Sequence, residues 1–184
     1  AIIGCGIRGK AHARELARLT DCDVAWVCDP DLDRADEVGA LLVELKRPMP
    51  KKAQDLRKVL EDKSVDVVFI ATPNHWHALA AIWAMQAGKD VYVEKPVSQN
   101  VEEGRRIVQV ARKLGRIAQT GTQNRSRGAL AEAVKFMREG KLGEVKLAKS
   151  IIYSGRGSIG GPAVEKARHR SCKPVPSGSS TLRI

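Results

Sequence analysis

Apolar and polar positions follow two different patterns along residues 1–140. Short apolar runs, typical of strands buried on both faces, alternate with longer stretches whose apolar residues recur every three or four positions, as on one face of a helix. The apolar runs lie at 1–5, 23–29, 65–71, 90–94 and 116–120, and the helical stretches at 11–19, 32–46, 55–61, 76–87, 101–114 and 128–139. Strands and helices in alternation predict an α/β fold with a parallel sheet.

Start and stop signals support these boundaries. Asn100 followed by Glu103 is a capping-box-like start for the helix over 101–114, and Gly115 follows its last apolar position. Pro73 breaks the strand before the helix that Gly88 ends. The two prolines of "RPMPKK" interrupt the pattern near residue 50, where we expect a weak strand or a loop.

The first turn reads "GCGIRG" and places Gly4, Gly6 and Gly9 in a GxGxxG pattern between a strand and a helix. Glycines at this spacing allow a tight turn, a close approach of the backbone to a diphosphate, and close packing of the helix on its strand. Unpaired N–H groups and the helix dipole favour an anion there. We therefore expect a dinucleotide on this turn, including the intervening Ile7 and Arg8.

Asp29 ends the second predicted strand, about twenty residues after the glycine turn. A carboxylate at this place accepts hydrogen bonds from a free ribose 2′-hydroxyl and repels a 2′-phosphate, which predicts NAD over NADP. Arg8 and Arg34 would weaken that preference. The alternative is that the glycines only build a tight turn and that Asp29 only caps the helix after Pro30.

Five motifs together resemble the Gfo/Idh/MocA oxidoreductases, the relatives of glucose-fructose oxidoreductase and inositol dehydrogenase. They are "GCGIRG", "ATPNHWH", "EKP", "AQTGTQNRS" and "GKLGEV", and the resemblance covers residues 1–160. It implies a doubly wound Rossmann sheet with helices on both faces, strand order 3-2-1-4-5-6, followed by a larger sheet domain that carries the substrate.

The resemblance also implies roles for single residues. Lys95 of "EKP" would lie beside nicotinamide and substrate as the catalytic lysine, with Glu94 orienting or neutralising it and Pro96 fixing the turn. A surface Lys-Pro corner after an edge strand is the alternative. Thr72, Pro73 and Asn74 would line the cofactor cleft, and His77 would help to fix the same loop. The resemblance also places His77, Glu94 and Lys95 in the cofactor-binding set.

Gln123 and Arg125 follow the sixth strand, where Gln123 would contact the cofactor and Arg125 would reach substrate or phosphate. A solvated loop position is the alternative for both. His75 and His77 form an HxH pair, but no Asp, Glu or Cys ligand is set nearby, so we expect no metal.

We divide the chain into a dinucleotide-binding domain over 1–124, a linking helix and first strand of a truncated α+β sheet domain over 125–154, and an irregular basic tail over 155–184. The alternating run "EVKLAKSIIYS" is the expected strand. Relatives supply a second catalytic group from the sheet domain, and we do not assign that role to His169 of the tail.

The predicted function is hydride transfer between NAD, less readily NADP, and a secondary alcohol of a sugar, cyclitol or related polyol, in a chain that lacks most of the substrate domain. A non-catalytic nucleotide-binding module of the same fold is the alternative. We expect the full-length form to be a homo-oligomer through the sheet domain.

The composition of the chain speaks to the other partners it could have, such as nucleic acids or membranes. The net charge is +11, but residues 1–104 hold 14 Lys/Arg against 17 Asp/Glu, so the basic excess lies in the second half. Aromatic residues make up only 4%, which speaks against nucleic-acid binding. No apolar stretch has a membrane helix's length. Four cysteines without metal-ligand spacing predict free thiols and a cytoplasmic protein, although a targeting peptide upstream of Ala1 would be invisible.

Overall fold

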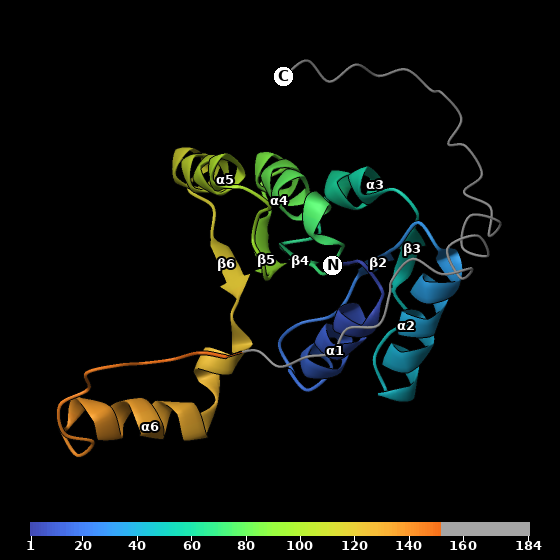
Figure 1. Cartoon of the computed structure of the whole chain (residues 1–184). Coiled ribbons are helices and arrows are strands. Elements are labelled where there is room, and N and C mark those ends of the chain that lie inside the picture. Colours follow the sequence, from blue (N-terminus) through green and yellow to red (C-terminus); the bar gives the residue numbers. More distant parts are fainter. Residues whose placement is uncertain (152–184) are drawn as a thin grey trace, which may run out of the picture.

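The computed structural model describes residues 1–151, which form a parallel sheet flanked by helices (Figure 1). The strands are β1 (Ile2–Ile3), β2 (Trp26–Cys28), β3 (Lys51–Ala53), β4 (Val67–Ile70), β5 (Asp90–Glu94) and β6 (Ala118–Gly121). The helices are α1 (Ile7–Leu16), α2 (Leu32–Glu44), α3 (Leu56–Glu61), α4 (His77–Gln86), α5 (Val101–Leu114) and α6 (Gly128–Arg138), with 3-10 turns η1 (Asn74–Trp76) and η2 (Gln123–Ser126).

The six strands are ordered β3-β2-β1-β4-β5-β6, and every neighbouring pair is parallel. The predicted strand order and the doubly wound architecture are therefore confirmed. The order reverses between β1 and β4, and all strands end at the same edge of the sheet. In open α/β sheets, ligands bind outside this carboxyl edge at the point of reversal.

The strands in the middle of the sheet have residues buried on both faces, as the uninterrupted apolar runs predicted, whereas the edge strands β3 and β6 are partly exposed. Figure 1 shows α3, α4 and α5 along one face and α1 and α2 along the other. Neighbouring residues of β1 point to opposite faces: Ile3 packs with Val68, Ile70 and Val91 under α4, whereas Ile2 packs with Val38 and Leu42 under α2. These two clusters hold the carboxyl edge in place.

Local signals position the helices beside this edge. Asn100 Oδ1 accepts a hydrogen bond from the N–H of Glu103 at 2.9 Å, which confirms the capping-box-like start of α5. The return hydrogen bond differs from a capping box, because Glu103 Oε2 accepts from the N–H of Gln99, at 2.9 Å, rather than from that of Asn100. Gly115 ends α5 in the left-handed conformation, with φ of 61°. The segment near residue 50, expected as a weak strand or loop, forms the edge strand β3.

The first helix begins earlier than its apolar pattern indicated. The pattern first recurs at Ala13, whereas α1 starts at Ile7, inside the glycine motif. Gly9 and Arg8 therefore lie in the first turn of the helix rather than in a loop before it. The polar first turn of an anion-binding helix carries no apolar periodicity, which explains the missed boundary.

The strand expected over 144–154 is absent from its described part, because residues 144–151 have no regular structure. A strand is stabilised by pairing with a neighbour, and in the part of the chain that the structure describes no strand lies beside this segment. Residues 152–154 and the tail over 155–184, with His169, lie outside the described residues. The helix α6 stands apart from the two helical layers in Figure 1.

Candidate functional site

The glycine turn is shaped by close backbone contacts. Gly4 has φ of 91°, and a Cβ there would lie 2.6 Å from the carbonyl carbon of Ala71, at the end of β4. A Cβ on Gly9 would lie 2.0 Å from the carbonyl oxygen of Gly4, so only glycine lets α1 pack this close to β1. A Cβ on Gly6 would meet nothing within 4 Å. Two glycines thus build the turn, and the third faces open space.

The first turn of α1 presents backbone donors to that open space. The first N–H group of α1 paired within the helix is that of Lys10, which donates to the carbonyl oxygen of Gly6 at 3.0 Å. Helix geometry gives the N–H groups of Ile7, Arg8 and Gly9 no intrahelical acceptor. The side chain of Ile7 is 89% exposed beside them. This arrangement suits an anion with an apolar neighbour.

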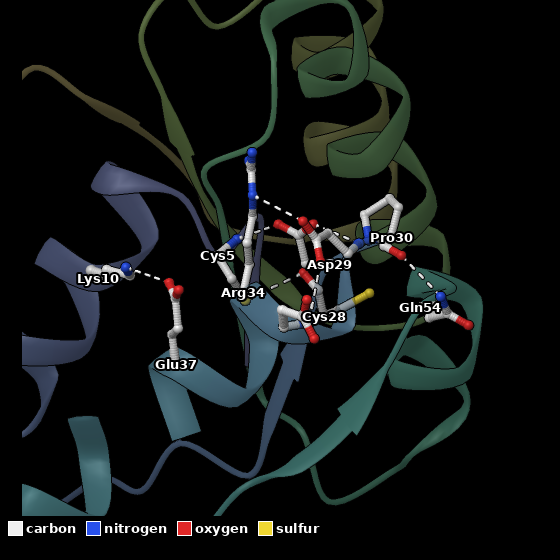
Figure 2. Close-up of polar contacts among 10 residues, drawn as sticks. Cys5, Lys10, Cys28, Asp29, Pro30, Arg34, Glu37 and Gln54 are labelled. Carbon is white, nitrogen blue, oxygen red and sulfur yellow. Dashed lines mark hydrogen bonds and ion pairs between the residues drawn. The ribbon is translucent and has the colours of Figure 1, made fainter. Parts of the chain in front are cut away.

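Asp29 lies directly after β2 and faces the same turn, as Figure 2 shows. Its Oδ2 accepts a hydrogen bond from the N–H of Cys5 at 2.8 Å, and its Oδ1 accepts from the N–H of Asp31 at 3.0 Å. The cap of α2 is Asp31, whose side chain accepts from the N–H of Asp33. The alternative in which Asp29 only caps that helix is therefore wrong, since Asp29 also tethers the glycine turn.

Cys5 and Cys28 lie buried beneath this corner as free thiols. Burial, with the nearby Asp29 carboxylate, raises the pKa of Cys5 to about 12, and burial next to Cys5 raises the pKa of Cys28 to about 12. Both thiols stay protonated at neutral pH, which makes them poor nucleophiles. They act as packing groups. Cys22 is a third free thiol, and Cys172 lies outside the described residues.

His77 joins the loop after β4 to the loop after β5. Its Nε2 lies 2.8 Å from the carbonyl oxygen of Thr72, and its Nδ1 lies 2.6 Å from the carbonyl oxygen of Pro96. Carbonyl oxygens only accept, so a ring nitrogen that carries a hydrogen donates to the carbonyl oxygen that it faces. The side chain is 1% exposed. The structure thus gives His77 the contacts of a residue that fixes the loop.

The side-chain hydroxyl of Thr72, like the N–H groups at the start of α1, is a polar group that is available to a ligand. Its Oγ1 is buried and has no hydrogen-bond partner among the residues that the structure describes. Buried hydroxyl groups in proteins are normally hydrogen-bonded. Pro73 and Asn74 follow at the start of η1 and lie, like Thr72, just past the carboxyl end of β4. These three residues therefore flank the point where the strand order reverses.

Glu94 has different partners from the one expected. Its Oε1 accepts hydrogen bonds from Arg8 Nη2 at 2.6 Å and lies 3.0 Å from His12 Nε2. Lys95 follows β5 in a bend, and no hydrogen bond or ion pair joins it to Glu94 in the described part of the chain. That Glu94 orients or neutralises Lys95 therefore stays a prediction. Glu94 is only 3% exposed, whereas the side chain of Arg8 is 41% exposed.

The environment of this cluster shifts two pKa values downward. Burial lowers the pKa of His12, and the attraction of Glu94 only partly offsets it. For Glu94, burial raises the pKa, but the hydrogen bonds and charges of Arg8 and His12 outweigh burial and hold the pKa below its usual value. At neutral pH the cluster is therefore an Arg8–Glu94 ion pair beside a neutral imidazole.

Sequence reasoning missed His12 and its aromatic surroundings. The His12 ring lies 5.3 Å from the Tyr92 ring, edge to face, and 5.5 Å from the Phe69 ring. One signal was present, because Arg8 and His12 are four residues apart and so share a helix face. A second was Glu94, a carboxylate at the end of a strand buried on both faces, where a charge needs a partner.

The remaining predicted residues line the same edge of the sheet. Lys95 is exposed directly after β5, and within residues 1–151 its amino group has neither a hydrogen bond nor an ion pair. Gln123 and Arg125 are exposed in η2, just past the end of β6. The residues expected from the sequence thus gather past the ends of β1, β2, β4, β5 and β6. No metal-binding cluster of His, Cys, Asp or Glu occurs in the described part of the chain.

A dinucleotide fits this set of residues. The structure offers backbone donors at the start of α1, open space above Gly6, a carboxylate at the end of β2 and an unpaired buried hydroxyl at Thr72. These features lie on both sides of the strand-order reversal, as an extended ligand with a central diphosphate requires. Each oxygen of Asp29 already accepts one hydrogen bond and keeps a second lone pair for a ribose hydroxyl.

Comparison with known proteins agrees with this geometry. Residues 1–122 match the model of the Gfo/Idh/MocA oxidoreductase family, described as having an NAD-binding Rossmann fold. Scyllo-inositol 2-dehydrogenase (NAD(+)) of Bacillus subtilis is 32% identical over 171 residues, which are 92% of this chain and 47% of that protein. An α-N-acetylgalactosaminidase of Shewanella oneidensis is 35% identical over 113 residues, 59% of this chain and 25% of that protein.

A solved structure gives the same result. Scyllo-inositol dehydrogenase of Lactobacillus casei, crystallised with NAD(H) and scyllo-inositol, matches with a TM-score of 0.69 at 25% identity, over 78% of this chain and 41% of that one. The chain therefore spans about half the length of the curated inositol dehydrogenases it matches.

Proposed function

The chain belongs to the Gfo/Idh/MocA oxidoreductase family, and on that premise we propose that it binds NAD and forms the cofactor domain of a polyol dehydrogenase. The proposed substrate is a secondary alcohol of a sugar, a cyclitol such as inositol, or a related polyol. The inositol dehydrogenases among its relatives support this substrate class. The division into a cofactor domain over 1–124 and a following substrate domain is part of the proposal.

Three groups of residues would hold the cofactor. The backbone of Gly4, Gly6, Ile7, Arg8 and Gly9 would bind the diphosphate. Asp29 would accept hydrogen bonds from the adenosine ribose. The nicotinamide end would then lie toward the ends of β4 and β5, where Thr72, Pro73, Asn74 and Lys95 are, with Gln123 beyond them.

In this proposal Lys95 assists the removal of the proton from the alcohol hydroxyl group. Bound nicotinamide would supply the hydride acceptor for the alcohol carbon. Lys95 would donate a hydrogen bond to the alcohol oxygen, stabilising the negative charge that develops as the hydroxyl proton leaves. Arg125, from η2, would bind a further oxygen of the substrate. His77 and Glu94 would act indirectly, by holding Thr72, Pro96 and Arg8.

One observation carries the proposal: the 2.8 Å hydrogen bond from the N–H of Cys5 to Asp29 joins the glycine turn to this carboxylate, so the proposed phosphate and ribose sites would form one unit. A buried carboxylate at the ribose position favours NAD, because a 2′-phosphate would bring two more negative charges next to it. Arg34 is held by Asp31 at 3.4 Å and so is partly neutralised.

The test is titration of the chain with NAD and, in parallel, NADP, followed by thermal unfolding. A single site predicts about 2.7 kcal/mol of stabilisation at a hundredfold excess of ligand over its dissociation constant. We expect this for NAD and a smaller effect for NADP at the same concentration. If NAD leaves the unfolding transition unchanged, the proposal is wrong.

A non-catalytic nucleotide-binding module of the same fold makes a different prediction. Residues 1–184 alone are expected to bind NAD and to turn over poorly, so the comparison uses a chain that also carries the substrate domain. There a dehydrogenase forms reduced nicotinamide when a polyol such as inositol is added, measured by its near-ultraviolet absorbance, and Lys95→Ala abolishes this turnover while NAD affinity is retained. A binding module binds NAD but gives no polyol-dependent signal with either variant.

A further inference from the structure

The ion pair between Arg8 and Glu94 reaches across β4 at the carboxyl edge of the sheet. Arg8 is the second residue of α1, which follows β1, whereas Glu94 is the last residue of β5. β4 lies between β1 and β5 in the sheet, so the two strand ends are on the order of 10 Å apart. The side chain of Arg8 crosses this distance, and its Nη2 lies 2.6 Å from Glu94 Oε1.

The direction in which Arg8 reaches is opposite to that of Asp29. Asp29 follows β2, on one side of β1, and Glu94 ends β5, on the other side. On the proposed function, the diphosphate lies at the start of α1 and the adenosine ribose at Asp29. The second nucleoside must then extend past β4 toward β5, which is where the guanidinium of Arg8 is held.

The two partners are unequally exposed. The side chain of Glu94 is 4% exposed and that of Arg8 is 41% exposed, so the carboxylate is the buried anchor and part of the arginine faces outward. Glu94 holds one nitrogen of a group with five N–H donors in fixed geometry. The remaining donors suit acceptors, and the nicotinamide nucleoside offers ribose oxygens and a carboxamide oxygen.

We propose that Arg8 recognises the nicotinamide nucleoside half of the dinucleotide and that Glu94 is the positioning residue that aims it. This inference rests on the proposed function and deepens it, because it assigns one charged side chain to one half of the cofactor. Glu94 then affects cofactor binding through Arg8, which lies 86 positions away in the chain. A purely structural pair between α1 and β5 is the rival explanation.

The test compares two ligands, NAD and ADP, on the same variants by titration calorimetry. ADP carries adenosine and both phosphates but lacks the second ribose and nicotinamide. For Arg8→Gln we expect NAD to bind about tenfold more weakly, the loss of one charge-assisted hydrogen bond, and ADP affinity to change less than about twofold. If Arg8 instead acted through its charge on the phosphates, Arg8→Gln would weaken the binding of ADP at least as much as the binding of NAD.

Two further variants separate positioning from folding. Glu94→Gln keeps an acceptor for Arg8 but removes the charge, and we expect a smaller loss of NAD affinity with ADP unchanged. The double variant should bind NAD no more weakly than Arg8→Gln alone, because both changes disable one unit. Arg8→Lys keeps the charge and should bind NAD better than Arg8→Gln.

The matched control is Arg18→Gln, which breaks the exposed 3.0 Å pair with Glu15 beyond the other end of α1. It should leave the affinity for both ligands unchanged. Equal losses for NAD and ADP, or no loss for either, overturn the assignment of Arg8, while wild-type binding of both ligands keeps the proposed function. A wild-type chain that binds neither ligand overturns both. Thermal unfolding of each variant verifies that it is folded during the titration.

Discussion

Cys5 and Asp29 are joined by a hydrogen bond in which the backbone N–H of Cys5 donates to Oδ2 of Asp29 at 2.8 Å. The end of β2 is thereby tied to the turn that follows β1. One carboxylate stabilises the shape of the glycine turn and, on the proposed function, also binds the ribose. The two roles can be separated by experiment.

Asp29→Ala leaves the N–H groups of Cys5 and Asp31 without their acceptor, so we expect the unfolding free energy to fall by about 1–3 kcal/mol, measured by urea denaturation. NAD affinity should fall as well, and the preference for NAD over NADP should shrink because the repelling carboxylate is gone. Calorimetric titration with both cofactors measures this ratio.

The control for this prediction is Asn100→Ala, which removes the cap of α5, away from Asp29 and Arg34. We expect it to cost about 1 kcal/mol of stability and to leave the NAD-to-NADP ratio unchanged. If both variants lose NAD affinity in proportion to their stability, the ribose role of Asp29 is wrong and its role is structural.

We expect the replacement of Gly9 by alanine to lower stability more than the replacement of Gly6 by alanine. A Cβ on Gly9 would lie 2.0 Å from the carbonyl oxygen of Gly4, so Gly9→Ala forces the backbone apart and should cost about 2 kcal/mol or more. Gly6→Ala meets no atom within 4 Å, at a φ of −71° that alanine tolerates, and should cost less than about 1 kcal/mol.

The same pair distinguishes folding from binding. The methyl group of Gly6→Ala projects into the space above the turn, where we place the diphosphate, so NAD affinity should fall although the fold is intact. Urea denaturation and NAD titration of both variants measure the two effects. A Gly6→Ala variant that binds NAD as well as wild type contradicts the placement of the diphosphate.

Features of the fold that depend on neighbours in sequence were predictable. The strand order follows from the alternation of strands and helices together with the family resemblance, and Asn100 and Glu103 lie within one helical turn. Residues 144–151 show the limit of this reasoning. Their alternation indicated a strand, but a strand is stabilised by a partner, and the described residues provide none there.

The contacts of the candidate site were harder to predict, because they join residues far apart in the chain. The glycines and Asp29 could be placed from their spacing alone. In contrast, Glu94 is bound by Arg8 and His12, 86 and 82 positions away, and nothing in the local pattern of "EKP" shows that its carboxylate points toward α1. Only the packing of α1 on the sheet determines these partners.

The cluster of His12 and Glu94 predicts that the fold weakens in acid. The pKa of His12 is lowered from 6.5 in the folded chain, so the unfolded chain binds more protons once the pH falls below about 6.5, and stability declines from there toward the folded pKa. The pKa of Glu94 is also lowered, from 4.5, so its contribution is lost at still lower pH, as its carboxylate is protonated.

Urea denaturation of wild type and His12→Asn between about pH 7.5 and about pH 5 measures the first of these effects. The wild-type unfolding free energy should decrease over this interval, and the decrease should be smaller in His12→Asn, which has no imidazole to protonate. Equal slopes in the two proteins would show that His12 does not resist protonation in the fold.

His77 gives the sharpest prediction for the loops around the crevice, since its ring contacts the carbonyl oxygens of both Thr72 and Pro96. His77→Leu fills similar volume but removes the ring nitrogens that face these two oxygens and so leaves a buried carbonyl without its donor, and we expect a loss of about 2 kcal/mol in unfolding free energy. His75→Leu is the matched control, because His75 is exposed two residues earlier and should change stability by less than about 0.5 kcal/mol.

The same two variants test whether His77 matters for the site as well as for the fold. When the bridge is lost, the loops carrying Thr72 and Lys95 are no longer held together, so NAD affinity should fall in His77→Leu and remain unchanged in His75→Leu. His77→Gln, whose amide can donate to one of the two oxygens, should lie between them in both measurements. If His77→Leu is as stable as wild type, the bridge contributes nothing to the loops, and the role assigned to His77 is wrong.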